Sequence, residues 1–383
     1  MPPVPVPDSL LAKLIERRIR PDVRAMHAYA VQDASGLLKL DAMENPHGLP
    51  VELQAALGAR LGAVALNRYP DARVAMLRLA LAAYAGLPGG HALMLGNGSD
   101  ELISLLALAC AQPLDARTGA KPVLLAPEPG FVMYAMSAQL QGLDYVGVPL
   151  LPDFELDTSA MLQAIAHQQP ALVYLAHPNN PTANLWDADA MERIVAAAAQ
   201  AGSLVVIDEA YQPFASRSYR DLMAADPERH AHVLLLRTLS KFGLAGVRLG
   251  YLMGHSALIS QIDKVRPPYN ISALNCECAL FALEHAEVFA AQAADILAQR
   301  ERLQQAFARL PGVQAFASEA NMILLRLRGN ADRAAGVFDA LKAHGILVKN
   351  VSKMHPLLGN CLRITVGTAY ENTQLLAALQ EIL

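Results

Sequence analysis

The stretch 204–211, Leu-Val-Val-Ile-Asp-Glu-Ala-Tyr, shows the pattern from which the fold of this 383-residue chain is predicted. Four consecutive apolar residues that end in a polar cluster are typical of a strand buried on both faces. Five similar apolar runs occur at 92–95, 123–126, 172–176, 233–236 and 247–253. Helical spacing of apolar residues fills the intervals, notably at 99–111, 131–140 and 188–200. We therefore predict an α/β fold with a mainly parallel sheet between helices.

The C-terminal part of the chain has a different pattern. Helical periodicity lengthens at 275–310, and strand-like runs return at 322–327 and 362–366, which predicts a smaller α+β domain. Residues 1–40 carry a helical opening at 10–19 followed by a polar arm. We expect an N-terminal arm with part of the small domain at 1–45, a large domain at 46–274 and the small domain at 275–383.

Composition excludes several functions. A net charge of −4 without a long basic run argues against a nucleic-acid partner. Charges, Gly and Pro interrupt every apolar run before the roughly 18–20 residues of a membrane helix, and the N-terminus does not resemble a signal peptide. The pair Cys276 and Cys278 lacks a second pair at zinc-ligand spacing, so we expect half-buried thiols and no metal. A cytoplasmic location is the simplest interpretation.

Polar clusters follow five of the six predicted strands. They are Gly96-Asn-Gly-Ser-Asp100, Pro127-Glu-Pro-Gly-Phe131, His177-Pro-Asn-Asn-Pro-Thr182, Asp208-Glu-Ala-Tyr211 and Arg237-Thr-Leu-Ser-Lys241. Ligands of open α/β sheets bind beyond the carboxyl ends of the strands. One crevice should therefore bring all five clusters together.

Lys241 stands between a predicted buried strand and the Gly-containing stretch 242–246. A lone lysine is usually a solvated surface charge. A lysine amine attacks a carbonyl only when it is unprotonated, which requires burial or a nearby cation to lower its pKa. Arg248, seven residues further on, is within reach of the same pocket and suits a phosphate.

Asp208 allows two interpretations. A carboxylate at the end of a strand often caps the next helix. It can also pair with the ring nitrogen of a pyridine cofactor and keep that nitrogen protonated, so that the ring accepts electrons. Asn180 and Tyr211 would then hydrogen-bond the phenolate oxygen of the ring, and Phe131 would stack on its face.

The turn Gly98-Ser99-Asp100-Glu101 is predicted to open a helix. Unpaired N–H groups and the helix dipole suit a phosphate there, although capping by the two acids explains the same residues. The turn lacks the Gly-x-Gly-x-x-Gly fingerprint of nicotinamide dehydrogenases and the Gly-Lys-Ser/Thr of a P-loop.

Taken in order, these elements resemble the fold-type I, pyridoxal-5′-phosphate (PLP)-dependent aminotransferases of class I and II, and within them the histidinol-phosphate group. The resemblance runs nearly end to end. It rests on Met43-Glu-Asn-Pro46, Asn67-Arg-Tyr-Pro70, Gly98-Ser-Asp-Glu101, Pro178-Asn-Asn-Pro-Thr182, Asp208-Glu-Ala-Tyr211, Thr238-Leu-Ser-Lys241 and Leu362-Arg-Ile-Thr-Val-Gly-Thr368.

The resemblance implies a role for each candidate residue. Lys241 would form the Schiff base with PLP and carry the proton, Asp208 would pair with the ring nitrogen, and Tyr211 and Asn180 would hold the phenolate. The cofactor phosphate would be bound by Ser99, Asp100, Thr238, Ser240, Arg248 and, from the neighbouring subunit of a homodimer, Tyr69. Arg363 would bind the acceptor carboxylate and the substrate phosphate, while the other substrate-side residues would be Tyr29, Asn45, Asn321 and Lys349.

The implied reaction exchanges an amino group between L-histidinol phosphate and 2-oxoglutarate in histidine biosynthesis. Alternatives within the same fold are an aromatic aminotransferase and a decarboxylase of phosphorylated amino acids, because the ring chemistry is shared. A PLP-sensing domain of a transcription regulator would need a DNA-binding module, for which residues 1–40 are too short.

The chain departs from the family pattern in three respects. The interval from Lys241 to Arg248 is one residue shorter than in many members. Ala183 replaces the usual Gly after Asn-Pro-Thr, which is tolerable if its φ stays negative. Lys349 stands where many relatives carry Arg, and a lysine cannot form a bidentate contact with phosphate.

Overall fold

The computed structural model describes residues 10–26, 32–112 and 119–383, which fall into two units, 1–35 and 36–383. In the first unit, α1 (Leu10–Arg18) and α2 (Pro21–Ala25) are the described helices. The helical opening predicted at 10–19 is therefore confirmed to within one residue. Leu10, Leu11 and Leu14 of α1 are exposed.

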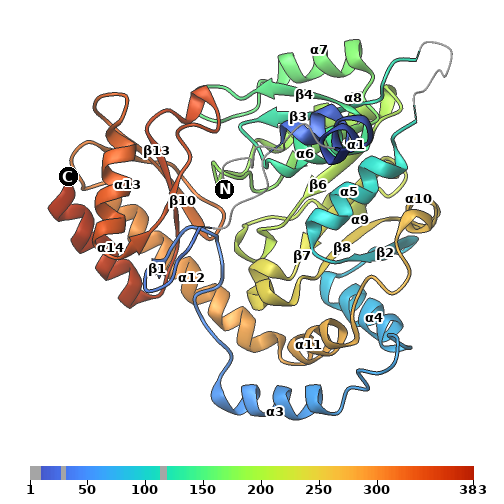
Figure 1. Ribbon diagram of the computed structural model, residues 1–383, viewed down its shortest axis with the longest axis horizontal. Helices are drawn as coiled ribbons and strands as arrows, with labels where there is room; N and C mark the ends of the chain where they lie inside the picture. Colours follow the sequence, from blue (N-terminus) through green and yellow to red (C-terminus); the bar gives the residue numbers. More distant parts are fainter. Residues whose placement is uncertain (1–9, 27–31, 113–118) are drawn as a thin grey trace. The chain divides into compact units, whose positions relative to one another are not determined.

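The second unit contains a seven-stranded sheet in the order β2-β8-β7-β6-β5-β3-β4, drawn in Figure 1. In this sheet β8 runs opposite to the other strands, and the pairs that do not involve β8 are parallel, so the predicted α/β fold with a mainly parallel sheet is confirmed. The strands are β2 (His91–Gly96), β3 (Val123–Glu128), β4 (Asp144–Pro149), β5 (Leu172–Ala176), β6 (Leu204–Asp208), β7 (Val233–Thr238) and β8 (Gly250–His255).

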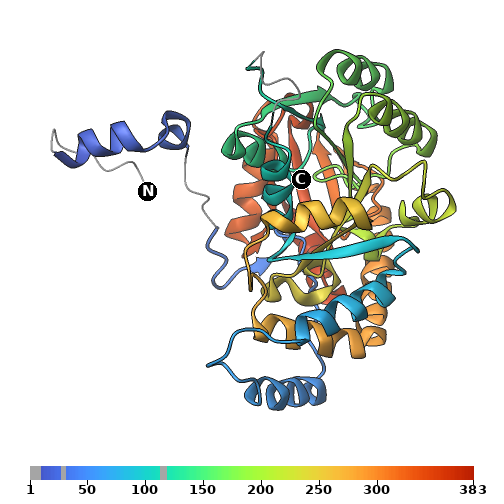
Figure 2. The ribbon, with the colours of Figure 1, turned by 90° about the vertical axis from the view of Figure 1, so that its right-hand side faces the viewer.

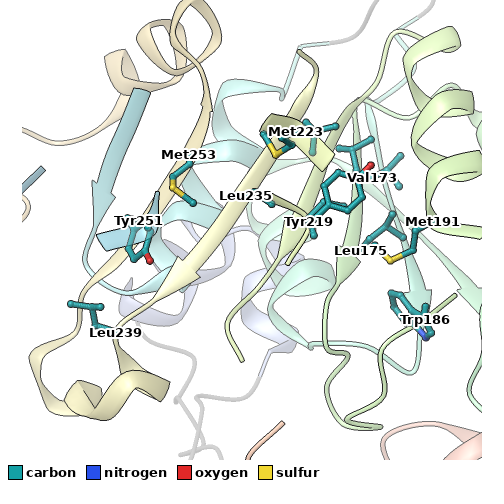
Figure 3. Close-up of a cluster of buried hydrophobic side chains, with 14 of the residues drawn as sticks. Val173, Leu175, Trp186, Met191, Tyr219, Met223, Leu235, Leu239, Tyr251 and Met253 are labelled. Atoms are coloured by element: carbon teal, nitrogen blue, oxygen red, sulfur yellow. The ribbon is translucent and has the colours of Figure 1, made fainter. Parts of the chain in front are cut away.

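Both faces of the sheet are covered, which explains why its strands are apolar throughout. Successive side chains of a strand point to opposite faces. In β6, Val205 and Ile207 join the core cluster partly drawn in Figure 3, while Val206 joins the cluster on the other face. One face packs against α5 (Ser99–Ala109), α6 (Met133–Gln141) and α10 (Ser256–Ile262), and the other against α4 (Arg73–Ala85), α7 (Thr158–Gln168), α8 (Ala188–Gln200), α9 (Arg220–Ala225) and α11 (Ala273–Glu284).

Two strand predictions need correction. The strand β4 has no wholly apolar run because it lies at the sheet edge and is only partly covered, so the sequence pattern missed it. The run predicted as a strand at 247–253 begins instead as a 3₁₀ turn, Ala245–Val247, and β8 starts at Gly250. Arg248 has a φ of 54°, which an extended strand does not permit.

A second sheet, in the order β12-β13-β10-β9, is antiparallel and packs against α12 (Ala286–Phe307), α13 (Arg333–Ala343) and α14 (Ala369–Ile382). Its strands are β9 (Val313–Ala315), β10 (Met322–Leu327), β12 (Lys349–Asn350) and β13 (Cys361–Thr365). The predicted strand at 322–327 is thus confirmed, and the helical region at 275–310 is divided between α11 and α12. The smaller α+β part expected from the sequence therefore has a core of its own.

The segment after residue 36 packs with this second sheet. A short parallel pair joins β1 (Leu38–Lys39) to β11 (Ile346–Leu347), and Leu40 and Met43 enter the same core. The chain then continues into α3 (Val51–Gly62), which runs beside α11 in Figures 1 and 2. Arg60 of α3 donates from Nε to Glu277 Oε1 at 2.6 Å. The boundaries proposed at 45 and 274 remain predictions.

No helix in the described part of the chain is long and apolar enough to cross a membrane. Cys276 is buried and Cys278 half-buried on α11, as free thiols. Within residues 10–26, 32–112 and 119–383, no group of three or more His, Cys, Asp or Glu side chains forms a candidate metal site.

Candidate active site

A cavity of about 330 Å³ opens where the strands of the large sheet end. Side chains from all five polar clusters line it, so the prediction that one crevice unites them is confirmed. Ten sequence-predicted residues contribute to its wall: Ser99, Asp100, Phe131, Asn180, Asp208, Tyr211, Thr238, Ser240, Lys241 and Arg248.

Lys241 projects into this cavity from the turn that follows β7. Its Nζ donates to the backbone carbonyl of Ala42 at 3.2 Å and lies 5.7 Å from the ring centre of Tyr211. Burial, followed by the positive charge of Arg363, lowers the pKa of Lys241 to about 8. A substantial fraction of this amine is therefore neutral in mildly alkaline solution, as a nucleophile or proton carrier requires.

The backbone around Lys241 depends on a glycine. Residues Ser240–Leu244 form a π-helical turn in which Gly243 has a φ of 136°. A Cβ at Gly243 would lie 2.8 Å from the ring of Phe289. No other residue satisfies both the positive φ and the close approach, so Gly243 shapes the turn that presents the lysine.

Asp208 is the last residue of β6 and is 5% exposed. Its Oδ2 accepts from the Tyr134 hydroxyl at 2.7 Å, and its Oδ1 accepts from the Ala210 N–H at 3.0 Å. The helical turn that follows begins at Gln212 with Tyr211 as its N-cap, so the interpretation of Asp208 as a helix cap is wrong. Burial raises the pKa of Asp208 to about 6.

Another group of residues in the cavity wall suits an anion. There, α5 begins at Ser99 behind Gly98, whose φ is 82° and whose Cβ would lie 2.7 Å from Arg248 Nη2. The Thr238 hydroxyl donates to that of Ser240 at 2.9 Å. The Arg248 guanidinium lies 3.3 Å from the Asp100 carboxylate. Hydroxyls, an arginine and a helix N-terminus together are typical of a phosphate site.

These features fit both the ring nitrogen and the phosphate of PLP. In the part of the chain that the structure describes, no lysine, arginine or histidine forms an ion pair with Asp208. A buried carboxylate without a positive partner suits a ligand that carries a protonated ring nitrogen. The serine, threonine and arginine side chains near α5 suit the phosphate of PLP. The Lys241 amine suits reaction with the aldehyde of PLP.

Arg363 lies just outside the cavity wall, on β13. Its Nη1 donates to Asn180 Oδ1 at 2.7 Å, and its Nη2 donates to the Asp41 carbonyl at 2.9 Å. Lys349 of β12 is its direct partner across the antiparallel pair. The two cations predicted to bind the substrate, Arg363 and Lys349, therefore lie on adjacent strands. Arg363 contacts the cavity wall through Asn180.

Asn321 and Asn45, two further predicted substrate residues, do not line the cavity. Asn321 is fully buried, and its Nδ2 donates to the Met43 carbonyl at 3.0 Å. Asn45 donates from Nδ2 to Gln292 Oε1 at 2.9 Å. Both asparagines therefore hold the 42–45 segment, of which Met43 and Glu44 line the cavity. Tyr29 lies outside the described residues.

Tyr69 is not part of the cavity of its own chain. It is 77% exposed and stacks on Tyr269, with ring centres 4.6 Å apart and planes 19° apart. The same pair lines a separate, open surface hollow of about 920 Å³.

The sequence interpretation missed Tyr134 and Ala42, both of which line the cavity. Tyr134 lies on α6, three residues after Phe131, which precedes this helix in the structure. In the helix predicted at 131–140, that spacing places both residues on the same side. That spacing was the available signal for Tyr134. Ala42 contacts Lys241 through its backbone carbonyl, so a pattern of side chains in the sequence does not predict this contact.

Ala183 has a φ of 66°, contrary to the expectation of a negative value. It keeps the left-handed conformation for which a glycine is best suited, and its Cβ is fully buried in the second core. The buried packing of that methyl group offsets part of the backbone strain.

Comparison with known proteins gives consistent matches. The chain matches the family described as aminotransferase class I and II over residues 35–379. It is 65% identical to the histidinol-phosphate aminotransferase of Polaromonas naphthalenivorans (strain CJ2), covering 98% of each chain. It is 64% identical to that of Paracidovorax citrulli (strain AAC00-1), covering 97% of this chain and 99% of the relative.

Among solved structures, the chain is similar to histidinol-phosphate aminotransferase from Sinorhizobium meliloti in complex with pyridoxal-5′-phosphate. The TM-score is 0.79 at 26% identity, and the match covers 95% of this chain and 97% of that one. With the family match spanning most of the sequence and near-full-length relatives above 60% identity, this chain belongs to the class I and II aminotransferase family.

Proposed function

We propose that this chain is a PLP-dependent aminotransferase that exchanges an amino group between L-histidinol phosphate and 2-oxoglutarate, in the cytoplasmic biosynthesis of histidine. The observation that carries the proposal is the single cavity in which Lys241, Asp208 and a phosphate-binding corner meet. The two relatives compared above, at 65% and 64% identity, bear the corresponding name. Four free thiols agree with a reducing compartment.

PLP, when bound, accepts the negative charge that remains when a proton leaves the substrate carbon. Asp208 would hold the ring nitrogen, and Asn180 and Tyr211 the ring oxygen. Ser99, Asp100 through its backbone N–H, Thr238, Ser240 and Arg248 would hold the phosphate. Phe131 would cover one face of the ring and exclude water from it.

Lys241 would bond to the cofactor and later move the proton between the amine-bearing carbon of the substrate and the aldehyde carbon of the cofactor. Its pKa of about 8 places the amine close to balance between its two protonation states. A proton carrier works best when its pKa lies near the operating pH. The neighbouring Arg363 charge contributes to this balance by disfavouring the protonated amine.

A steady-state assay tests the reaction type. Histidinol phosphate with 2-oxoglutarate should yield glutamate at a stoichiometry of one per substrate consumed. Release of carbon dioxide from a phosphorylated amino acid would instead indicate the decarboxylase, and a preference for phenylalanine or tyrosine would indicate the aromatic aminotransferase.

Arg363→Ala should weaken both half-reactions, because one guanidinium would bind the phosphate of histidinol phosphate and the carboxylate of glutamate. Loss of a bidentate, charge-assisted contact should lower kcat/KM by roughly 10²-fold for each substrate, or about 3 kcal/mol. Lys349→Ala on the adjacent strand is the matched comparison and should impair only the phosphorylated substrate. A defect of Arg363→Ala that is confined to one substrate would refute the dual role.

The active form is proposed to be a homodimer with shared sites. Tyr69 is exposed and does not line the cavity of its own chain, although the motif around it is typical of a cofactor-binding tyrosine. A second subunit that delivers this hydroxyl to the phosphate would explain both observations.

Mixing two inactive variants should restore part of the activity. One variant carries Arg68→Ala with Tyr69→Phe, and the other carries Lys241→Ala. After subunit exchange, one of the two sites in each heterodimer would have both intact contributions. The recovered rate in exchanged samples, verified by native mass measurement, checks the prediction. If confirmed heterodimers remain inactive, each subunit builds its own site.

A further inference from the structure

Among the residues that the structure describes, Tyr134 is the aromatic residue of the cavity wall that hydrogen-bonds the Asp208 carboxylate. It lies on α6, is 2% exposed, and its hydroxyl donates to Asp208 Oδ2 at 2.7 Å. Its ring stacks on Tyr174 of β5, with centres 4.4 Å apart and planes 27° apart. Phe131 meets the same ring edge-on at 5.7 Å. The hydroxyl is therefore held in place by its surroundings and not by the carboxylate alone.

We propose that Tyr134 is a positioning residue that fixes the orientation of Asp208 and keeps this carboxylate ionised for the cofactor ring nitrogen. The inference rests on the proposed pairing of Asp208 with that nitrogen. It assigns to a residue of α6 a part in the reaction that the motif around Asp208 does not contain.

Two hydrogen bonds define how the carboxylate is held. Oδ1 accepts the Ala210 N–H from the same chain segment, and Oδ2 accepts the Tyr134 hydroxyl from a different element. With one donor on each oxygen, rotation of the carboxylate about its Cβ–Cγ bond breaks at least one bond. Removing the hydroxyl leaves only the local Ala210 contact.

The charges around Asp208 oppose its ionisation. Burial raises its pKa most, the Tyr134 hydroxyl and the Ala210 N–H lower it, and the charges of Asp100 on α5 and the adjacent Glu209 raise it. Burial raises the pKa of the Tyr174 phenol on β5 and of the Tyr211 phenol, and the charge of Asp208 raises both further. The Tyr134 hydroxyl is thus the main side-chain contact that favours the ionised form.

The sign of the pH effect follows from this balance. In the cofactor-free protein the pKa of Asp208 is about 6, so below that pH the carboxyl must release a proton before it pairs with a protonated ring nitrogen. Affinity for the cofactor should therefore fall as the pH drops through about 6. Without the hydroxyl the pKa rises, and the fall begins at higher pH.

The test compares Tyr134→Phe with Tyr174→Phe in the full-length protein, using PLP itself as the probe. Each variant loses one hydroxyl from the same stacked pair and keeps its ring. Among the described residues, the fully buried Tyr174 hydroxyl has no hydrogen-bond partner, so this substitution is a matched control. PLP affinity is measured by absorbance titration from pH 5 to 8.

The midpoint of the affinity profile should move upward by about one pH unit in Tyr134→Phe, equivalent to about tenfold weaker binding below the midpoint. The profile of Tyr174→Phe should coincide with that of the wild type. The cofactor's own ionisations are the same in every titration, so a difference between variants belongs to the protein. Thermal unfolding of each cofactor-free variant verifies that the fold is retained.

A third variant separates this inference from the proposed function. Asp208→Asn should remove the pH dependence that the wild type shows near pH 6. If it does and the Tyr134→Phe profile overlays the wild type, the positioning role of Tyr134 is wrong while Asp208 keeps its part. If Asp208→Asn behaves as the wild type, the pairing of Asp208 with the ring nitrogen fails. An equal shift in Tyr174→Phe would also overturn the proposal, because stacking and not the hydroxyl would then govern Asp208.

Discussion

Lys241→Ala should abolish covalent attachment of PLP and lower the transamination rate by at least about 10⁴-fold. The lysine supplies both the amine that bonds to the cofactor and the base that moves the substrate proton. Among the described residues of the cavity wall, Lys241 is the only lysine. Asp208, Tyr211 and Ala42 line the same cavity, and none of them can take over the covalent role.

Borohydride reduction followed by peptide mapping checks the assignment. The wild-type protein should carry the cofactor label on the peptide that contains Lys241, and Lys241→Ala should carry none. Lys264→Ala, at an exposed lysine on a short 3₁₀ turn, is the matched control and should be labelled and active as the wild type is. Label on any other lysine would show that the assignment of Lys241 is mistaken.

Asp208→Asn should leave PLP bound but slow proton abstraction by roughly 10³-fold, or about 4 kcal/mol in the barrier. The amide has the shape of the carboxylate and still accepts a hydrogen bond from the Tyr134 hydroxyl. It carries no charge, however, so it cannot stabilise a protonated ring nitrogen, and the ring becomes a weaker electron acceptor.

Single-turnover measurements with saturating histidinol phosphate isolate this step from cofactor binding. Asp187→Asn provides a comparison, because Asp187 caps α8 through the Ala190 N–H at 2.9 Å and lies outside the cavity wall. It should leave the single-turnover rate unchanged. A near-normal rate in Asp208→Asn would mean that the buried carboxylate has a structural role alone.

The parts of the fold that sequence reasoning predicted well are those buried on both faces. The runs at 172–176 and 204–207 are wholly apolar because helices cover both sides of β5 and β6. Parallel strands bring their carboxyl ends to one edge, so the polar clusters after β2, β3, β5, β6 and β7 could be placed in one crevice without knowledge of the strand order. The edge strand β4 lacks this double cover and was missed.

Other parts of the site depend on contacts between distant segments. The bond from Arg363 to Asn180 joins residues 183 positions apart, and no local pattern indicates it. The Tyr134 hydroxyl reaches Asp208 across 74 positions, although periodicity alone describes Tyr134 as an ordinary core residue of α6. The positive φ of Ala183 reverses the expectation for that position, because burial in the second core holds a methyl group where the backbone favours glycine.

The most direct test of the account is an absorbance spectrum of the purified protein before and after addition of L-histidinol phosphate. The near-ultraviolet and visible band of the bound cofactor should change when one equivalent of L-histidinol phosphate per subunit is added. Adding 2-oxoglutarate should restore the band and convert the 2-oxoglutarate to glutamate. That result would establish cofactor, substrate and amino transfer together. A protein without such a band, or one whose band responds to aromatic amino acids but not to histidinol phosphate, would contradict the proposed reaction.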